Sequence, residues 1–155
     1  MFAVALVFTL SVAAQTVQLS AECPAQFGFP TSYQVVGTPL AGQAVVLSQT
    51  SQLVFGASGF LLHVKVIGFS DPALPLPSCG CAVRASLDFV VAQISMPTST
   101  TWVHNTSLNL PLPPGSTGLV FYTQSFALHP WTFGVGCVEL GVATEASQSY
   151  QVTIQ

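Results

Sequence analysis

The chain has 155 residues, of which 50% are hydrophobic and 5% are charged, and its formal net charge is -3. Its two basic residues, Lys65 and Arg84, are too few to bind the phosphates of a nucleic acid or to attach the chain to an anionic membrane surface. High hydrophobicity with little charge argues against a disordered chain, and the length favours one domain.

The chain opens with MFAVALVFTLSVAAQ, in which an unbroken apolar run from Phe2 to Leu10 leads into small residues. This pattern is typical of a secretory signal peptide, and the run is shorter than the roughly 20 apolar residues that span a bilayer. No Lys or Arg precedes the run, although signal peptides usually carry one there. We predict a signal peptide at 1–14 and a single domain at 15–155, secreted or displayed at the cell surface, with no membrane span in the mature chain. An apolar first strand is the alternative.

From residue 15 onward, apolar and polar residues alternate with the period of a β-strand, and helical periodicity is absent. In FLLHVKVIGF, the even-numbered residues from Phe60 to Val66 should share a buried face, and His63 should lie on the solvated face. Val83–Phe89 predicts another strand, with Arg84 and Asp88 on its exposed side. Further strands are predicted at Gln15–Glu22, Ser32–Val36, Gln43–Ser48, Trp102–Leu110, Leu119–Ala127, Val138–Thr144 and Ser149–Ile154.

Proline and glycine separate these strands at Gly37–Gly42, Ser70–Gly80, Ser95–Thr100 and Pro111–Gly118. Leu119–Ala127 carries apolar residues on both faces, which predicts a central strand or a strand with one face against something beyond the domain. Short strands between Pro/Gly turns predict an all-β fold, an antiparallel two-sheet β-sandwich.

Four cysteines, Cys23, Cys79, Cys81 and Cys137, form an even set in a chain that we expect to be exported, and this favours disulfide bonds. A Cys79–Cys81 bridge would close a very small, strained ring. Two arrangements stay open: Cys23–Cys81 with Cys79–Cys137, or Cys23–Cys79 with Cys81–Cys137. A metal or redox site is disfavoured because Cys-x-Cys lacks the Cys-x-x-Cys spacing and no nearby His completes a zinc site.

Five short motifs follow one another along the chain: Cys23-Pro24, GTPLAG, LPLP with GC at 74–81, LPLPPG followed by GLVFYTQSFAL, and a closing SYQVTI. In this order they resemble a family of secreted bacterial all-β domains of unassigned function. The resemblance implies an exported β-sandwich and no catalytic residue. The chain departs from the pattern at Cys79 and Cys137, which look like an added bridge, and in ATEASQ before the last strand.

Catalytic constellations are not recognisable in the sequence. IGFSDP is not a Gly-x-Ser-x-Gly elbow, the histidines His63, His104 and His129 are scattered, and the five acids form neither a calcium loop nor an obvious catalytic pair. We therefore expect a protein that is not an enzyme and that uses no cofactor or metal.

Aromatic residues are the remaining candidates for ligand binding. Trp102, Trp131 and Tyr122 could stack on sugar rings, although packing in the core is the favoured interpretation. We predict a non-catalytic structural or interaction module that self-associates or binds other surface proteins, with assembly through strand addition as one version. Gln15–Glu22 would add to a neighbour's sheet in that version, or form the first strand of its own domain. A carbohydrate-binding module is the alternative.

Overall fold

The protein is described by a computed structural model at residues 16–20, 31–52, 61–76, 81–96, 103–129, 137–139 and 142–155. Every regular element in these ranges is a β-strand, and all the strand pairs are antiparallel, so the predicted fold class is confirmed at this level. The strands are β1 (Thr16–Ser20), β2 (Ser32–Val36), β3 (Ala44–Gln52), β4 (Leu61–Gly68), β5 (Leu74–Leu76), β6 (Cys81–Val83), β7 (Phe89–Ser95), β8 (Val103–Pro111), β9 (Val120–His129), β10 (Cys137–Glu139) and β11 (Val142–Thr153).

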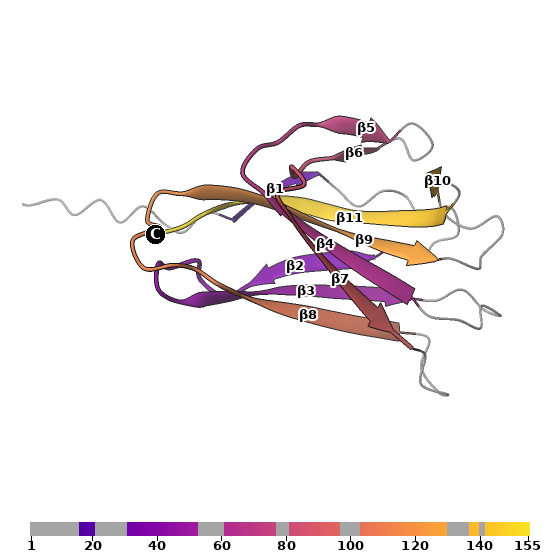
Figure 1. The fold of residues 1–155 in the computed structure, drawn as a ribbon, viewed down its shortest axis with the longest axis horizontal. Helices are drawn as coiled ribbons and strands as arrows, with labels where there is room; N and C mark the ends of the chain where they lie inside the picture. The colour runs from indigo at the N-terminus through magenta and orange to yellow at the C-terminus, as the bar shows by residue number, and fades with distance from the viewer. Residues whose placement is uncertain are drawn as a thin grey trace, which may run out of the picture.

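Three sheets make up the described part of the chain. The largest has the order β1-β11-β9-β4-β7, with β10 also paired to β11; the second has the order β2-β3-β8, and β5 pairs with β6. In Figure 1, β2, β3 and β8 lie on one side of the largest sheet, and the β5–β6 hairpin lies on the other side. Within the predicted segment Gln15–Glu22, the residues Thr16–Ser20 form β1, which pairs with β11 of the same chain.

The main hydrophobic core contains side chains from both larger sheets. Tyr33 of β2 and Leu47 of β3 pack in one cluster with Ile67 of β4, Phe121 of β9 and Val152 of β11, and all five are buried. Alternate residues of these strands point to one face, as the period of a strand requires. Burial of such side chains is the dominant favourable contribution to folding.

A second cluster covers the opposite face of the largest sheet. Val66 of β4, Phe126 of β9 and Ala146 of β11 are buried there, with Leu76 of β5 and Val83 of β6 packed against them. Strand β9 lies between β11 and β4 and has apolar residues on both faces. The prediction of a central strand at Leu119–Ala127 is therefore confirmed.

The strand predicted at Val83–Phe89 is wrong. Strand β6 ends at Val83 and β7 begins at Phe89, and a turn lies between them. Side chains in this turn bond the neighbouring backbone: the Asp88 carboxylate accepts bonds from the Phe69 N–H (2.8 Å) and the Ser86 hydroxyl (2.6 Å). Short polar side chains of this kind compete with strand pairing, and the alternation of apolar residues did not reveal them.

The prediction that His63 lies on a solvated face is also wrong. His63 and Lys65 are both fully buried, because the odd-numbered residues of β4 face the β2-β3-β8 sheet. The even-numbered residues Val64 and Val66 pack under the β5–β6 hairpin. A strand covered on both sides has no solvated face, so its polar residues are buried with their hydrogen-bond partners.

The turns predicted at the proline- and glycine-containing segments Gly37–Gly42 and Pro111–Gly118 are confirmed. Gly37 and Gly42 have φ of 100° and 80°, and Gly115 and Gly118 have φ of 82° and 84°, the left-handed region that favours glycine. Val138–Thr144 is divided between β10 and β11, and ATEASQ lies inside β11, where the register with β9 shifts between Ala146 and Ser149.

Candidate interaction surface

Strand β7 is the most exposed apolar element of the described chain. Its sequence FVVAQIS contains no charged residue, and Phe89, Val90 and Ile94 are 57%, 54% and 63% exposed. Ala92 is exposed as well, and Met96 follows directly at 74% exposure. Contiguous exposed apolar side chains of this kind mark interaction sites more often than scattered ones do.

The free edge of β7 adds backbone groups to this surface. Among the described strands, β7 is the last of the largest sheet and is paired on one side only, with β4 in an unbroken register from Leu61↔Ser95 to Ile67↔Phe89. Natural edge strands are commonly protected by Lys, Pro or a bulge, and β7 has none of these. An unprotected edge of this type is a template for pairing with another strand.

A pocket of about 480 Å³ opens beside the start of β7, between the two larger sheets. Thirteen of its fifteen lining residues are apolar. Phe69 and Phe89 stand at its mouth with their rings edge to face, 6.2 Å between centroids, and they are 61% and 57% exposed. Phe121 and Ile154 lie deeper in the pocket and are buried.

A buried polar cluster lies between β4, β7 and β8. The Lys65 ammonium donates hydrogen bonds to the side-chain oxygens of Gln93 (2.6 Å) and Thr106 (2.8 Å). The Ser95 hydroxyl lies 2.9 Å from both His63 Nε2 and His104 Nδ1. Burial lowers the pKa of Lys65 to about 8, because the charged ammonium loses hydration.

This cluster resembles an acid–base site in composition but not in accessibility. His63 and Lys65 are fully buried and His104 is 4% exposed. The pocket beside β7 does not include any of the three among its lining residues. A catalytic base must reach a substrate atom within hydrogen-bond distance. In the described part of the chain, this cluster bonds β4 to β7 and β8.

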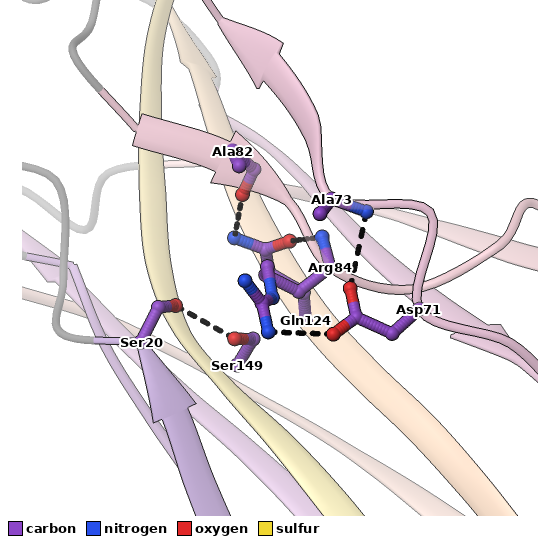
Figure 2. Close-up of polar contacts among 7 residues, drawn as sticks. All are labelled: Ser20, Asp71, Ala73, Ala82, Arg84, Gln124 and Ser149. Atoms are coloured by element: carbon purple, nitrogen blue, oxygen red, sulfur yellow. Dashed lines mark hydrogen bonds and ion pairs between the residues drawn. The ribbon is translucent and has the colours of Figure 1, made fainter.

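A second polar cluster bonds the β5–β6 hairpin to the largest sheet (Figure 2). Arg84 pairs with the Asp71 carboxylate at 2.6 Å, and the same carboxylate accepts a bond from the Ala73 N–H. Gln124 of β9 is buried, accepts a bond from the Arg84 N–H at 2.9 Å and donates to the Ala82 carbonyl at 3.2 Å. The Asp71 side chain thus bonds the backbone two residues further on, and Arg84 bonds Asp71 rather than sharing the predicted strand face with Asp88.

Replacement of Gln124 by Ala should lower the free energy of unfolding by about 2 kcal/mol, because it removes these bonds and one to the Ser147 carbonyl. Urea unfolding measures the change. Gln18→Ala is the matched control, since Gln18 is exposed and its side chain bonds only the nearby Ser20 carbonyl among the described residues. Equal costs for the two variants would contradict the role assigned to Gln124.

The structure brings few of the predicted site residues together. Cys81 begins β6 and packs against the second core cluster, and Tyr122 of β9 is half-buried against the same cluster. Cys137 begins β10. Residues 1–15, Cys23, Cys79, Trp102 and Trp131 lie outside the described residues, so the predictions made for them are untested. Phe69 and Phe89 were not predicted from the sequence; the uncharged apolar run FVVAQIS was the available signal for Phe89, and Phe69 had none.

Neither a helix able to cross a membrane nor a cluster of three or more metal-ligating side chains occurs in the part of the chain that the structure describes. Comparisons with protein-family models, curated proteins and solved structures find no match for this chain. The resemblance to secreted bacterial all-β domains thus stays a prediction.

Proposed function

We propose that this protein is a non-catalytic, exported interaction module that self-associates through strand β7, within a two-sheet β-sandwich. The observation that carries the proposal is the uncharged, apolar and unprotected edge of β7. The apolar N-terminal run and the low charge of the chain support export and association, since little charge repulsion opposes contact between copies. Side chains from both larger sheets in one core support the sandwich.

A second copy of the chain is the partner that the sequence of β7 fits best. Antiparallel pairing of β7 with itself, centred on Ala92, places Val90 opposite Ile94 of the other copy and Ala92 opposite its own counterpart. Asp88 then lies opposite Met96, so no like charges meet. The outward apolar face of both copies becomes continuous across the joint, and closed two-fold pairing of one surface with itself is the commonest symmetry among oligomers.

Disulfide bonds are part of the same proposal, as expected for an exported chain. No cysteine is free among the described residues, Cys81 included. Strand β10 places Cys137 opposite Thr144 of β11, two residues before Ala146, and Ala146 packs in the cluster that Cys81 contacts. This placement favours the Cys81–Cys137 arrangement, with Cys23–Cys79 as the second bridge.

Replacement of Ala92 by Lys should convert the dimer to a monomer, because two ammonium groups would face each other across the joint. We expect the dimer dissociation constant to rise by about tenfold or more in sedimentation equilibrium of the purified protein. Ala92 is exposed, so the fold should tolerate the change.

Two further samples make this test specific. Val17→Lys places the same charge on β1, the edge strand at the other end of the sheet order, and should leave the dimer intact. Mixing the Ala92→Lys and Ala92→Glu chains should restore dimers, because opposite charges then face each other. A wild-type protein that stays monomeric, or a mixture that does not dimerise, would overturn the proposal.

A further inference from the structure

The pocket beside β7 has the chemistry of a site for hydrocarbon. Its volume of about 480 Å³ falls within the range of small-molecule sites, and its lining has two polar residues. The Ser116 hydroxyl already donates to the Pro113 carbonyl at 2.7 Å, and Asn109 is exposed. A polar ligand group placed inside would lose its hydration without gaining partners, which is unfavourable. The buried part of a ligand must therefore be apolar.

The charges around the mouth restrict the part of the ligand that stays in water. Asp88 directly precedes Phe89 and is fully solvent-exposed, and hydrogen bonds from Ser86 and from the Phe69 N–H keep its pKa low, so it is ionised at neutral pH. The two basic residues of the chain offer no counter-charge, because Lys65 is buried and Arg84 bonds Asp71. A carboxylate or phosphate head would meet a negative charge with no cation beside it.

We propose that this pocket binds the alkyl chain of a single-chain amphiphile whose head group is not anionic. The alkyl chain of the ligand enters alongside Phe69 and Phe89 and contacts Val91 and Phe121 inside, and the head group stays in water near Asp88. The edge-to-face pair of phenylalanines gives the mouth a large apolar contact area. This inference does not depend on self-association, because it uses the interior between the sheets rather than the edge of β7.

The test uses three amphiphiles with the same twelve-carbon chain: dodecyl maltoside, dodecyltrimethylammonium and laurate, each below its micelle concentration. Displacement of the uncharged dye Nile red from the purified protein reports binding. We expect the maltoside and the ammonium compound to displace the dye, and laurate to bind at least tenfold more weakly. Shortening the maltoside chain should weaken binding by about fourfold per methylene removed.

Two neighbouring residues of β7 provide matched variants. Val91 lines the pocket, so Val91→Phe should fill it and reduce affinity by about tenfold or more. Val90 is 54% exposed on the other face of β7, so Val90→Phe makes the same change outside the pocket and should leave binding unaltered. If Val91→Phe fails to fold, Leu119→Asp takes its place in the test. Leu119 lines the pocket and is 55% exposed, so this change adds a second negative charge beside the pocket and should weaken the binding of dodecyl maltoside.

The Ala92→Lys chain separates this inference from the proposed dimer. Its pocket is intact, so it should bind dodecyl maltoside as the wild type does, even where it no longer dimerises. Equal affinity in the Val90→Phe and Val91→Phe chains, or no binding of the maltoside, would overturn the proposal. Laurate binding as tight as that of the maltoside would overturn the assignment of the head group.

Discussion

Replacement of Lys65 by Met should raise the free energy of unfolding by about 2 kcal/mol at pH 7.5. Burial lowers the pKa of Lys65 from 10.5 to about 8, so at this pH folding holds an ammonium ion in a place that disfavours the charge. Each unit of pKa difference corresponds to about 1.4 kcal/mol, which puts the cost of the charge at about 3 kcal/mol. The lost bonds to Gln93 and Thr106 offset about 1 kcal/mol of the gain.

The pH dependence of the wild type follows from the same shift. Between the folded pKa of about 8 and the unfolded value of 10.5, the unfolded chain binds more protons, so stability rises with pH. Urea unfolding at pH 7.5 and at pH 9.5 should show that the free energy of unfolding is about 2 kcal/mol higher at pH 9.5. The window ends there because burial raises the pKa of Tyr33 and Tyr150, and ionisation of these phenols favours unfolding above pH 10.

The free energy of unfolding of the Lys65→Met variant should change little between pH 7.5 and 9.5. The same polar cluster contains two other titratable groups, His63 on the same strand and His104 on β8, which both variants retain. Lys65→Arg is the control that keeps the charge, and it should be less stable than the wild type. An equal slope in Lys65→Met and wild type would assign the pH dependence to another group.

Gly68→Ala should be among the most destabilising single substitutions, with a loss of about 3 kcal/mol in the free energy of unfolding. A Cβ on Gly68 would overlap the Ser86 carbonyl oxygen, hydroxyl and amide nitrogen, and two of these are backbone atoms that cannot rotate away. Ser70 and Ser86 are also bonded through their backbones at this point, so the turn before β7 would have to separate from β4.

Gly118→Ala is the control for this prediction. Gly118 has φ of 84° and open space around it, so Ala there brings conformational strain without overlap and should cost about 1 kcal/mol. Chemical denaturation of both variants measures the difference. A cost at Gly68 no larger than that at Gly118 would contradict the close approach of β4 to Ser86.

The strands with clear alternation and flanking glycine or proline could be predicted from sequence, and β2, β3, β8 and β9 are examples. The buried face of β4 could not, because a strand covered by a sheet on one side and a hairpin on the other no longer alternates between core and solvent. Lys65 and His63 are buried among hydrogen-bond partners from β7 and β8. The residues next to Lys65 and His63 in the sequence do not indicate these partners.

The candidate site could be predicted least of all. Phe69 follows β4 directly and Phe89 begins β7, so the two rings meet only because β4 pairs with β7. Strand β7 itself has apolar residues on both faces, so period-2 alternation does not mark it. Low charge and high hydrophobicity predict a surface suited to contact, and the proposed self-association rests on that prediction. They do not predict that β7 presents an exposed apolar edge.

Hydrogen exchange of the wild-type protein at two concentrations tests the central claim most directly. If β7 pairs with β7 of a second copy, amides between Phe89 and Ser95 should exchange more slowly at high concentration than at low concentration, because those that face the free edge become bonded. Amides of β1 and β2, two edge strands that the proposed dimer leaves free, should exchange equally at both concentrations. Exchange in β7 that does not depend on concentration, or protection gained only at β1 or β2, would contradict assembly through β7.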